Sequence, residues 1–231
     1  MRTIGDIRAA IAADPSLTAL EDQIAARFES DPAHDRGHAL RVGIWTVRLR
    51  GDQVDPAKAI AAGLLHDIVN HPKDSERRGH ASGDSAEQAR LLLPGHGFSH
   101  QAIEEIARAI ADHSYSRRVV PTTALGKALQ DADRLDALGA LGTMRAVATG
   151  VQMGSRLFDP EDPWATHRPL DDRRFTLDHF FTKLLRLPET MQTAGGRREA
   201  AARVEFMIAY LEQLGSEIGA DLPAARTFRS S

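Results

Sequence analysis

Apolar residues recur every three or four positions along most of this chain, which is the spacing of one buried face of an α-helix. The pattern is clear at Ile4, Ile7 and Ile11 and is still present at residues 204–214. Aspartate caps a helix and proline suits its first turn, so Asp-Pro pairs are typical helix starts. Such pairs lie at residues 14–15, 31–32 and 55–56. The sequence predicts an all-α fold, since no segment has the alternation of a strand.

The length of the chain bears on its domain organisation. A chain of 231 residues is long for one helical domain but short for two. We predict a single domain over residues 1–231, with a helical bundle followed by C-terminal helices at about residues 175–219. Aromatic residues make up only 5% of the chain, so its core should be formed by aliphatic residues packed between helices.

Charge and composition exclude several classes of protein. The formal net charge of -3 argues against binding to polymeric nucleic acid. The chain has no cysteine, so any metal ion must be bound by nitrogen and oxygen atoms. Residues 1–13 lack the features of a secretory signal, and no apolar run approaches the roughly 20 residues needed to span a bilayer. We therefore expect a soluble, cytoplasmic protein that binds no membrane.

Breaks in the apolar pattern predict where the individual helices lie. One helix, over residues 57–68, carries the adjacent pair His66 and Asp67 near its end, and a polar loop follows at residues 70–85. Residues 150–172 form the longest stretch without helical spacing, which suits either a functional lid or a plain connector. Further helices are predicted over residues 85–93, 99–112, 122–141, 177–187 and 197–218.

Histidine and aspartate occur together in three short motifs. Seven of the ten histidines lie within residues 34–100, more than an aliphatic bundle needs. His38 stands in Asp-x-x-His-x-x-Arg, His66 precedes Asp67, and Asp133 lies in Asp-Ala-Asp-Arg-Leu-Asp. A His-Asp pair alone is most often structural. Three such motifs on three helices can meet at one point, however, and there form a binding site.

This order of motifs resembles the HD-domain phosphohydrolase superfamily. In that superfamily a histidine, a His-Asp pair and a distant aspartate bind a divalent metal ion inside a helical bundle. The resemblance covers about residues 33–141, which would form the metal-binding core. It implies that one metal ion is bound by His38, His66, Asp67 and Asp133.

A more specific resemblance lies just after the His-Asp pair. Residues 64–69, followed by Pro-Lys-Asp-Ser at 72–75 and Ala-Ser at 81–82, are similar to a bacterial subgroup that includes nucleoside triphosphate pyrophosphohydrolases. The chain departs from nucleotidase-type HD enzymes in one respect, because they have an acidic residue shortly after the pair where this chain has Asn70. A mechanism that uses this acidic residue is therefore not carried over.

The ligand types agree with metal-assisted hydrolysis. Two imidazoles and two carboxylates suit Mn²⁺, Fe²⁺, Co²⁺, Ni²⁺ or Zn²⁺ better than Ca²⁺, and they leave coordination positions for water and phosphate. We expect Mn²⁺, with the other ions and Mg²⁺ as alternatives. A bound cation lowers the pKa of its water from about 15.7 toward about 7, so that this water can attack phosphorus.

Four further histidines could in principle bind a second metal ion. The adjacent histidines of two-metal HD enzymes are absent from this chain, so a single metal ion is predicted. The histidines concerned are His71, His80, His96 and His100.

Phosphoryl transfer also needs positive charge around the phosphate oxygens. The candidates for binding substrate are Lys73, Arg77, Arg78 and Arg117, and for each the alternative is a solvated surface charge. The candidates for a role in catalysis are Lys73, Asp74 and His113. Asp74 could instead cap a loop, and His113 could instead cap the end of its helix.

The most specific interpretation is a metal-dependent phosphohydrolase of nucleotides that releases pyrophosphate from nucleoside or deoxynucleoside triphosphates. A nucleotide monophosphatase or phosphodiesterase is the alternative within the same class, since the shape of the pocket decides which phosphorus is attacked. A non-catalytic, nucleotide-binding regulatory module is the alternative from another class. The expected partner is a small phosphorylated molecule, and a homodimer is left open.

Overall fold

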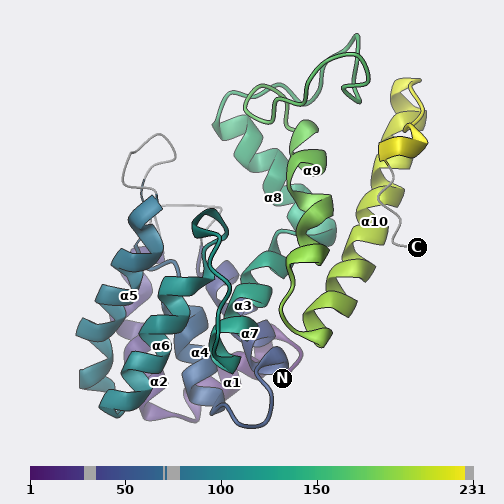
Figure 1. Cartoon of the computed structure of the whole chain (residues 1–231). Coiled ribbons are helices and arrows are strands. Elements are labelled where there is room, and N and C mark those ends of the chain that lie inside the picture. The colour runs from purple at the N-terminus through teal and green to yellow at the C-terminus, as the bar shows by residue number, and fades with distance from the viewer. Residues whose placement is uncertain (29–34, 70, 72–78, 227–231) are drawn as a thin grey trace. The chain divides into compact units, whose positions relative to one another are not determined.

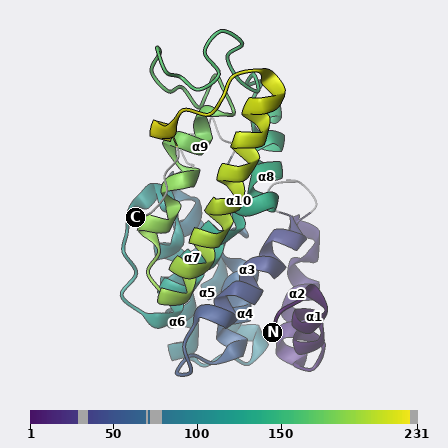
Figure 2. The ribbon, with the colours of Figure 1, turned by 90° about the vertical axis from the view of Figure 1, so that its right-hand side faces the viewer.

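The computed structural model describes residues 1–28, 35–69, 71 and 79–226 (Figure 1). Helices are the only regular secondary structure in these ranges (Figure 2), where an isolated bridge between Arg156 and Phe175 is the one β-type contact. The prediction of an all-α fold is confirmed. Within the same ranges, no helix is both long enough and apolar enough to cross a membrane.

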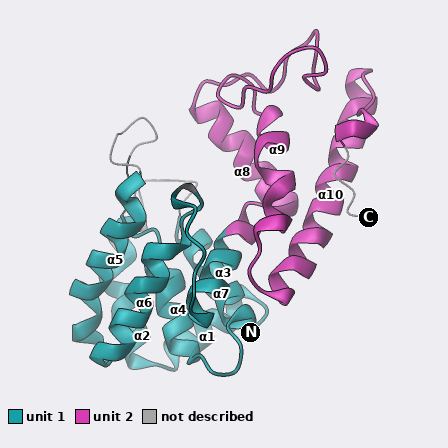
Figure 3. Cartoon of the chain, in the orientation of Figure 1, with its two compact units in different colours: residues 1–133 teal, residues 134–231 magenta. Residues whose placement is uncertain are grey.

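The chain divides into two compact units, residues 1–133 and residues 134–231 (Figure 3). In the described part of the first unit the helices follow the order α1 (Ile4–Ala12), α2 (Pro15–Ile24), α3 (Arg36–Leu49), α4 (Pro56–Leu65), α5 (Ala81–Leu92), α6 (His100–His113) and α7 (Ala124–Asp136). The last three residues of α7 belong to the second unit. The single HD-type domain expected over residues 1–231 remains a prediction.

Local side-chain caps explain where several helices of the first unit begin. Asp14, Asp55 and Ser99 each accept a hydrogen bond from a backbone N–H group in the first turn of α2, α4 and α6. A proline follows both aspartates at the first helical position. These bonds satisfy N–H groups that have no partner within the helix. The Asp-Pro pair at residues 31–32 lies outside the described residues.

Several helix ends differ from the sequence-based prediction. Helix α10 (Ala194–Ile218) begins three residues before the predicted start. Helix α4 ends at Leu65, because the chain turns tightly there and the N–H of Ile68 bonds to the carbonyl of Leu65. Helix α5 begins at Ala81, inside the predicted loop. Helix α7 ends at Asp136, and a new helix begins at Gly139, whose φ of +72° only glycine adopts at little cost. Apolar spacing continues across this break and therefore could not reveal it.

Helices α3 and α4 touch through two glycines. A Cβ atom at Gly63 would lie 2.5 Å from the Cα atom and 2.6 Å from the N atom of Gly43. Real Cβ atoms do not approach a backbone this closely, so only glycine permits the contact. Because His38 lies five residues before Gly43 and His66 three residues after Gly63, the contact also brings these histidines within reach of each other.

Gly63→Ala should therefore destabilise the first unit. Overpacking typically costs about 1–3 kcal/mol, and we expect the upper end because the atoms in the way are backbone atoms that cannot rotate aside. Gly83→Ala in α5 is the matched control, since no atom lies within 4 Å of a Cβ at Gly83 and alanine favours a helix by roughly 0.5–1 kcal/mol. Urea unfolding measures both variants, and equal midpoints would contradict the close contact of α3 and α4.

The described part of the second unit contains three α-helices, α8 (Gly139–Gln152), α9 (Asp178–Thr182) and α10 (Ala194–Ile218), and 3-10 turns at Leu184–Thr190 and Ala224–Arg226. Helix α10 packs along α8 and along the first of these turns. The predicted helix over residues 177–187 is only partly helical in the α sense. It is interrupted at Lys183, whose φ of -136° and ψ of -60° are not helical.

The segment between α8 and α9, residues 153–177, is held by buried polar contacts. Arg168 Nη1 and Nη2 lie 2.5 and 2.9 Å from the two carboxylate oxygens of Asp178, which is fully buried. The backbone N–H of Asp171 donates to the same carboxylate at 2.7 Å. Trp164 Nε1 donates to the carbonyl of Ala220 at 2.7 Å. These bonds tie the segment to Asp178 and to Ala220, and its role as a lid remains a prediction.

Candidate metal centre

Two buried histidines form the centre of the candidate site. His38 lies in the first turn of α3, where Asp35 caps the helix by accepting a 2.7 Å hydrogen bond from the His38 backbone N–H. His66 is the residue that directly follows the last residue of α4. Both are only 1% exposed. Their positions follow from the cap of α3 and the tight turn that ends α4.

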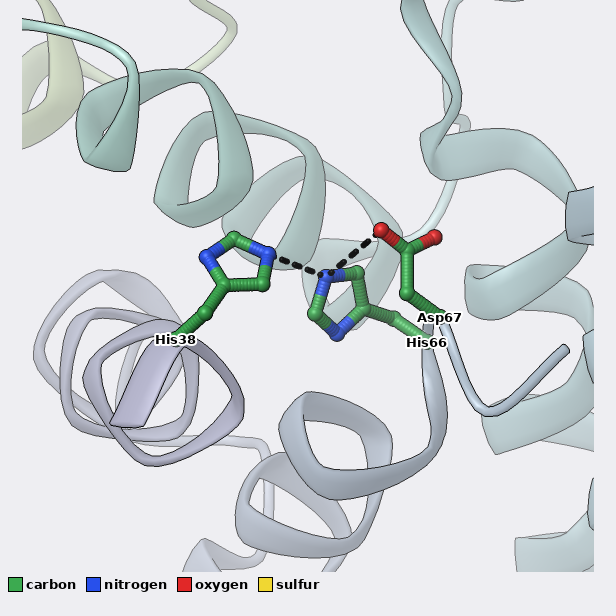
Figure 4. Close-up of side chains that lie close together, drawn as sticks. All are labelled: His38, His66 and Asp67. Atoms are coloured by element: carbon green, nitrogen blue, oxygen red, sulfur yellow. Dashed lines mark hydrogen bonds and ion pairs between the residues drawn. The ribbon is translucent and has the colours of Figure 1, made fainter. Parts of the chain in front are cut away.

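The metal-binding atoms of three predicted ligands converge (Figure 4). His38 Nε2 lies 3.1 Å from His66 Nε2, and His66 Nε2 lies 3.6 Å from Asp67 Oδ2. One potential ligand atom from each of these residues lies within 4.8 Å of the others. The side chain of Asp67 is 25% exposed, so it forms the border between the buried imidazoles and the solvent.

Helices α7 and α6 add two more side chains. Asp133 Oδ1, from α7, lies 3.7 Å from His38 Nε2 and 3.9 Å from His66 Nε2. His113, the last residue of α6, places its Nε2 atom 3.4 Å from Asp67 Oδ1. The first unit therefore brings together the four predicted ligands and one predicted catalytic residue.

Hydrogen bonding and burial keep His66 in the form that binds metals. Its Nδ1 atom lies 2.8 Å from the carbonyl of Gly63, which can only accept, so Nδ1 carries the proton and the lone pair is on Nε2. The pKa of His66 is lowered to about 4, mainly by burial; the charges of His38 and His113 contribute to the lowering, and the charge of Asp67 opposes it. At neutral pH the imidazole is neutral and can act as a ligand.

Two further groups of the cluster, His113 and Asp133, are shifted toward their ionised forms. Burial alone would lower the pKa of His113, but the hydrogen bond and the charge of Asp67 outweigh it and raise the pKa to about 9. Burial likewise opposes ionisation of Asp133, yet His113 and His66 hold its pKa below the usual value. The cluster thus combines the neutral imidazole of His66 with the anionic carboxylate of Asp133.

The residues fit a divalent cation. Nitrogen and oxygen ligands about 2.1 Å from a cation lie about 3.0–3.4 Å apart in tetrahedral or octahedral arrangements. The separations of 3.1, 3.6 and 3.7 Å between neighbouring ligand atoms are close to these values. The bond from His66 Nδ1 to a backbone carbonyl is also the usual way to orient a histidine ligand. A cation would need only small side-chain movements to bind here.

The structure describes only one of the residues predicted to bind substrate, Arg117. Lys73, Asp74, Arg77 and Arg78 lie outside the described residues. Arg117 is exposed at the end of a 3-10 turn (Tyr115–Arg117), and its Nη1 atom donates to the carbonyl of Ala111 at 2.6 Å. This bond anchors Arg117 at the end of α6, close in sequence to His113.

Two buried polar residues near the centre were not predicted. Ser85 of α5 is fully buried, and its Oγ atom both accepts from the N–H and donates to the carbonyl of Val69, which ties the chain after Asp67 to α5. Gln130 of α7 is also fully buried. Helical spacing could have indicated that both residues are buried, because they stand where the buried face of their helix is expected. It could not have identified their partners.

The fold and the site define an all-α protein with a candidate metal centre formed by two histidines and two aspartates. Residues 36–138 match the HD domain family, a range that contains all four predicted ligands. The chain belongs to the HD-domain superfamily.

Relatives of known structure support this assignment over most of the chain. Bacillus subtilis YpgQ is 29% identical over 196 residues, which are 82% of this chain and 87% of YpgQ. A crystal structure of YpgQ has a TM-score of 0.66 at 30% identity and covers 87% of this chain and 96% of that chain. YpgQ has also been crystallised in complex with ADP; that structure has a TM-score of 0.65 at 29% identity and covers 85% and 97%.

A second relative carries the name of the superfamily. The structure of a predicted HD superfamily hydrolase from an uncultured Thermotogales bacterium is 27% identical to this chain, with a TM-score of 0.61. It covers 91% of this chain and 98% of the other.

Proposed function

We propose that this protein is a divalent-metal-dependent phosphohydrolase that releases pyrophosphate from nucleoside or deoxynucleoside triphosphates. The observation that carries the proposal is the convergence of two buried imidazoles and two carboxylates, with His38 Nε2 and His66 Nε2 only 3.1 Å apart. The complex of YpgQ with ADP supports a nucleotide as the substrate.

The proposed ligands of the metal ion are His38, His66, Asp67 and Asp133, and the proposed ion is Mn²⁺. When bound, such a cation lowers the pKa of a coordinated water and polarises the phosphoryl oxygen. The chain's own contribution is a set of donor atoms already in place, since His66 is oriented by Gly63 and His38 by the cap of α3. Preorganised ligands bind without the cost of ordering flexible side chains.

His113 is proposed to donate a proton or a hydrogen bond to a phosphate oxygen. Its Nδ1 atom lies 2.6 Å from the carbonyl of Ile110, which holds the ring so that Nε2 faces Asp67. The positive charge around the phosphates is proposed to come from Arg117 together with Lys73, Arg77 and Arg78. Asp74 is proposed to orient the attacking water.

The test is a substrate panel in water enriched in ¹⁸O. Protein loaded with Mn²⁺ is incubated with nucleoside and deoxynucleoside triphosphates, ADP, monophosphates and a phosphodiester. Attack of water at the α-phosphorus breaks the bond to the β-phosphate and yields monophosphate and pyrophosphate. The ¹⁸O label should appear in the monophosphate and not in the pyrophosphate.

Other outcomes select the alternative functions. Release of inorganic phosphate from monophosphates, with intact triphosphates, would show a monophosphatase instead. Binding of nucleotides without any turnover would indicate a regulatory module.

A further inference from the structure

The end of α6 that carries His113 is closed by side chains rather than by further helix. The last carbonyls of an α-helix have no partner within the helix, and here three in succession accept from side chains. His113 Nδ1 bonds to Ile110, and Arg117 Nη1 bonds to Ala111. The third carbonyl, of Asp112, accepts from Gln130, which is on another helix.

Gln130 joins two segments with one amide group. Its Nε2 atom lies 3.0 Å from the carbonyl oxygen of Asp112 and 2.9 Å from that of Val119. Both partners can only accept, so the NH₂ group must face them and both of its hydrogens are used. The two bonded carbonyls lie on either side of the turn that contains Arg117. The amide therefore holds this turn closed as well as holding the end of α6.

The position of Gln130 on α7 links these two hydrogen bonds to the candidate metal centre. Gln130 precedes Asp133 by three residues, so the two side chains lie on the same side of the helix, about one turn apart. Asp133 faces His38 and His66, while Gln130 holds the helix end that carries His113. Helix α7 carries both Asp133 and Gln130. It therefore sets the distance between the carboxylate of Asp133 and the imidazole of His113.

The cost of burying this amide argues against a role in packing alone. Gln130 is fully buried, and its Oε1 atom has no hydrogen-bond partner among the described residues. A buried acceptor without a partner lowers stability, so an apolar side chain of the same size would serve packing better. An apolar residue could not supply the two N–H bonds that Gln130 donates to the carbonyls of Asp112 and Val119.

We propose that Gln130 is a positioning residue, which holds His113 and Arg117 in place relative to Asp133 through its two hydrogen bonds. It does not touch the metal or the substrate. Its effect on turnover rests on the proposed function, whereas its effect on the end of α6 does not.

Gln130→Met tests the two donors, because methionine has a similar size and no N–H group. Gln130→Asn keeps the amide but is one methylene shorter. If the donors matter, kcat should be highest for the wild type, lower for Gln130→Asn and lowest for Gln130→Met, with a loss of about 10–100-fold for the last. If only volume matters, Gln130→Met should be the better of the two variants. Metal content should equal that of the wild type in both.

Thr46→Val is the matched control. Thr46 is fully buried in α3, and its Oγ1 atom donates to the carbonyl of Val42 at 2.8 Å, so the variant also loses one buried hydrogen bond. We expect it to lower the melting temperature without changing kcat of the folded protein. A kcat of Gln130→Met that matches Thr46→Val would overturn the proposal.

Hydrogen exchange gives a readout that does not depend on turnover. Exchange of the backbone amides at residues 111–120 should be faster in Gln130→Met than in the wild type and unchanged in Thr46→Val. Wild-type exchange rates there in Gln130→Met would overturn the proposal. If the wild-type protein cleaves no member of the substrate panel, the proposed function fails, and hydrogen exchange alone decides the role of Gln130.

Discussion

His66→Ala should abolish metal binding and metal-dependent hydrolysis. The substitution removes the nitrogen that lies 3.1 Å from His38 Nε2, 3.6 Å from Asp67 Oδ2 and 3.9 Å from Asp133 Oδ1. Residues that merely hold a metal ligand in place are worth about 10–100-fold, so loss of the ligand itself should cost more than about 100-fold in kcat/KM. Metal content of the purified protein and activity per folded molecule measure the effect.

The same substitution also affects stability, which requires a control. It leaves a cavity at a buried position and takes the partner from the carbonyl of Gly63. Leu64→Ala in α4 creates a similar cavity two residues earlier and should cost about 2–5 kcal/mol while leaving the ligands in place. If His66→Ala behaves like Leu64→Ala, with lower stability but full metal content and activity, then His66 has only a structural role.

Asp178→Ala should have the largest effect on the stability of the second unit. The carboxylate of Asp178 is fully buried and accepts from both terminal nitrogens of Arg168 and from the N–H of Asp171. Removing one member of a buried ion pair leaves the other charge without compensation, which typically costs about 3–5 kcal/mol. Asp159 lies 3.5 Å from Arg168 Nε and should moderate the loss, so we expect about 3 kcal/mol.

Tryptophan fluorescence can measure this loss in one unit at a time. The chain has two tryptophans, Trp45 in the first unit and Trp164 in the second. In a Trp45→Phe background, urea unfolding followed by fluorescence reports on Trp164 alone.

Glu199→Ala is the control for Asp178→Ala, because Glu199 and Arg203 form an i,i+4 pair on one helix of the same unit, with side chains 33% and 21% exposed. Such pairs contribute about 0–1 kcal/mol. If both variants shift the urea midpoint equally, the buried pair of Asp178 and Arg168 contributes no more than the pair of Glu199 and Arg203.

Local sequence predicted the parts of the fold that depend on neighbouring residues. The caps at Asp14, Asp55 and Ser99 lie where the sequence indicated, because a cap needs only its own helix. The end of α7 was predicted wrongly. Apolar residues continue past Asp136, and only the backbone conformation of Gly139 reveals that one helix stops and another begins.

In the candidate site, too, some features were predicted from the sequence and others were visible only in the structure. The order of its motifs pointed to His38, His66, Asp67 and Asp133, and the structure places His66 Nε2 within 4 Å of an atom of each of the other three. The contribution of Gln130 was not predicted, because its two partners are backbone carbonyls at residues 112 and 119 on other segments. A buried glutamine has no sequence pattern that indicates which carbonyls it will meet.

The sequence by itself determined the helical class and several helix starts, since these depend on local spacing and caps. The four proposed metal ligands came from the resemblance of its motifs to the HD-domain superfamily. Only the tertiary structure decided the distances within the cluster and the protonated nitrogen of His66. The distances arise from contacts between distant segments, above all the approach of Gly43 to Gly63, whereas the bond that fixes the proton of His66 runs to Gly63, three residues earlier in the chain. Periodicity within one helix carries no information about the helix against which it packs.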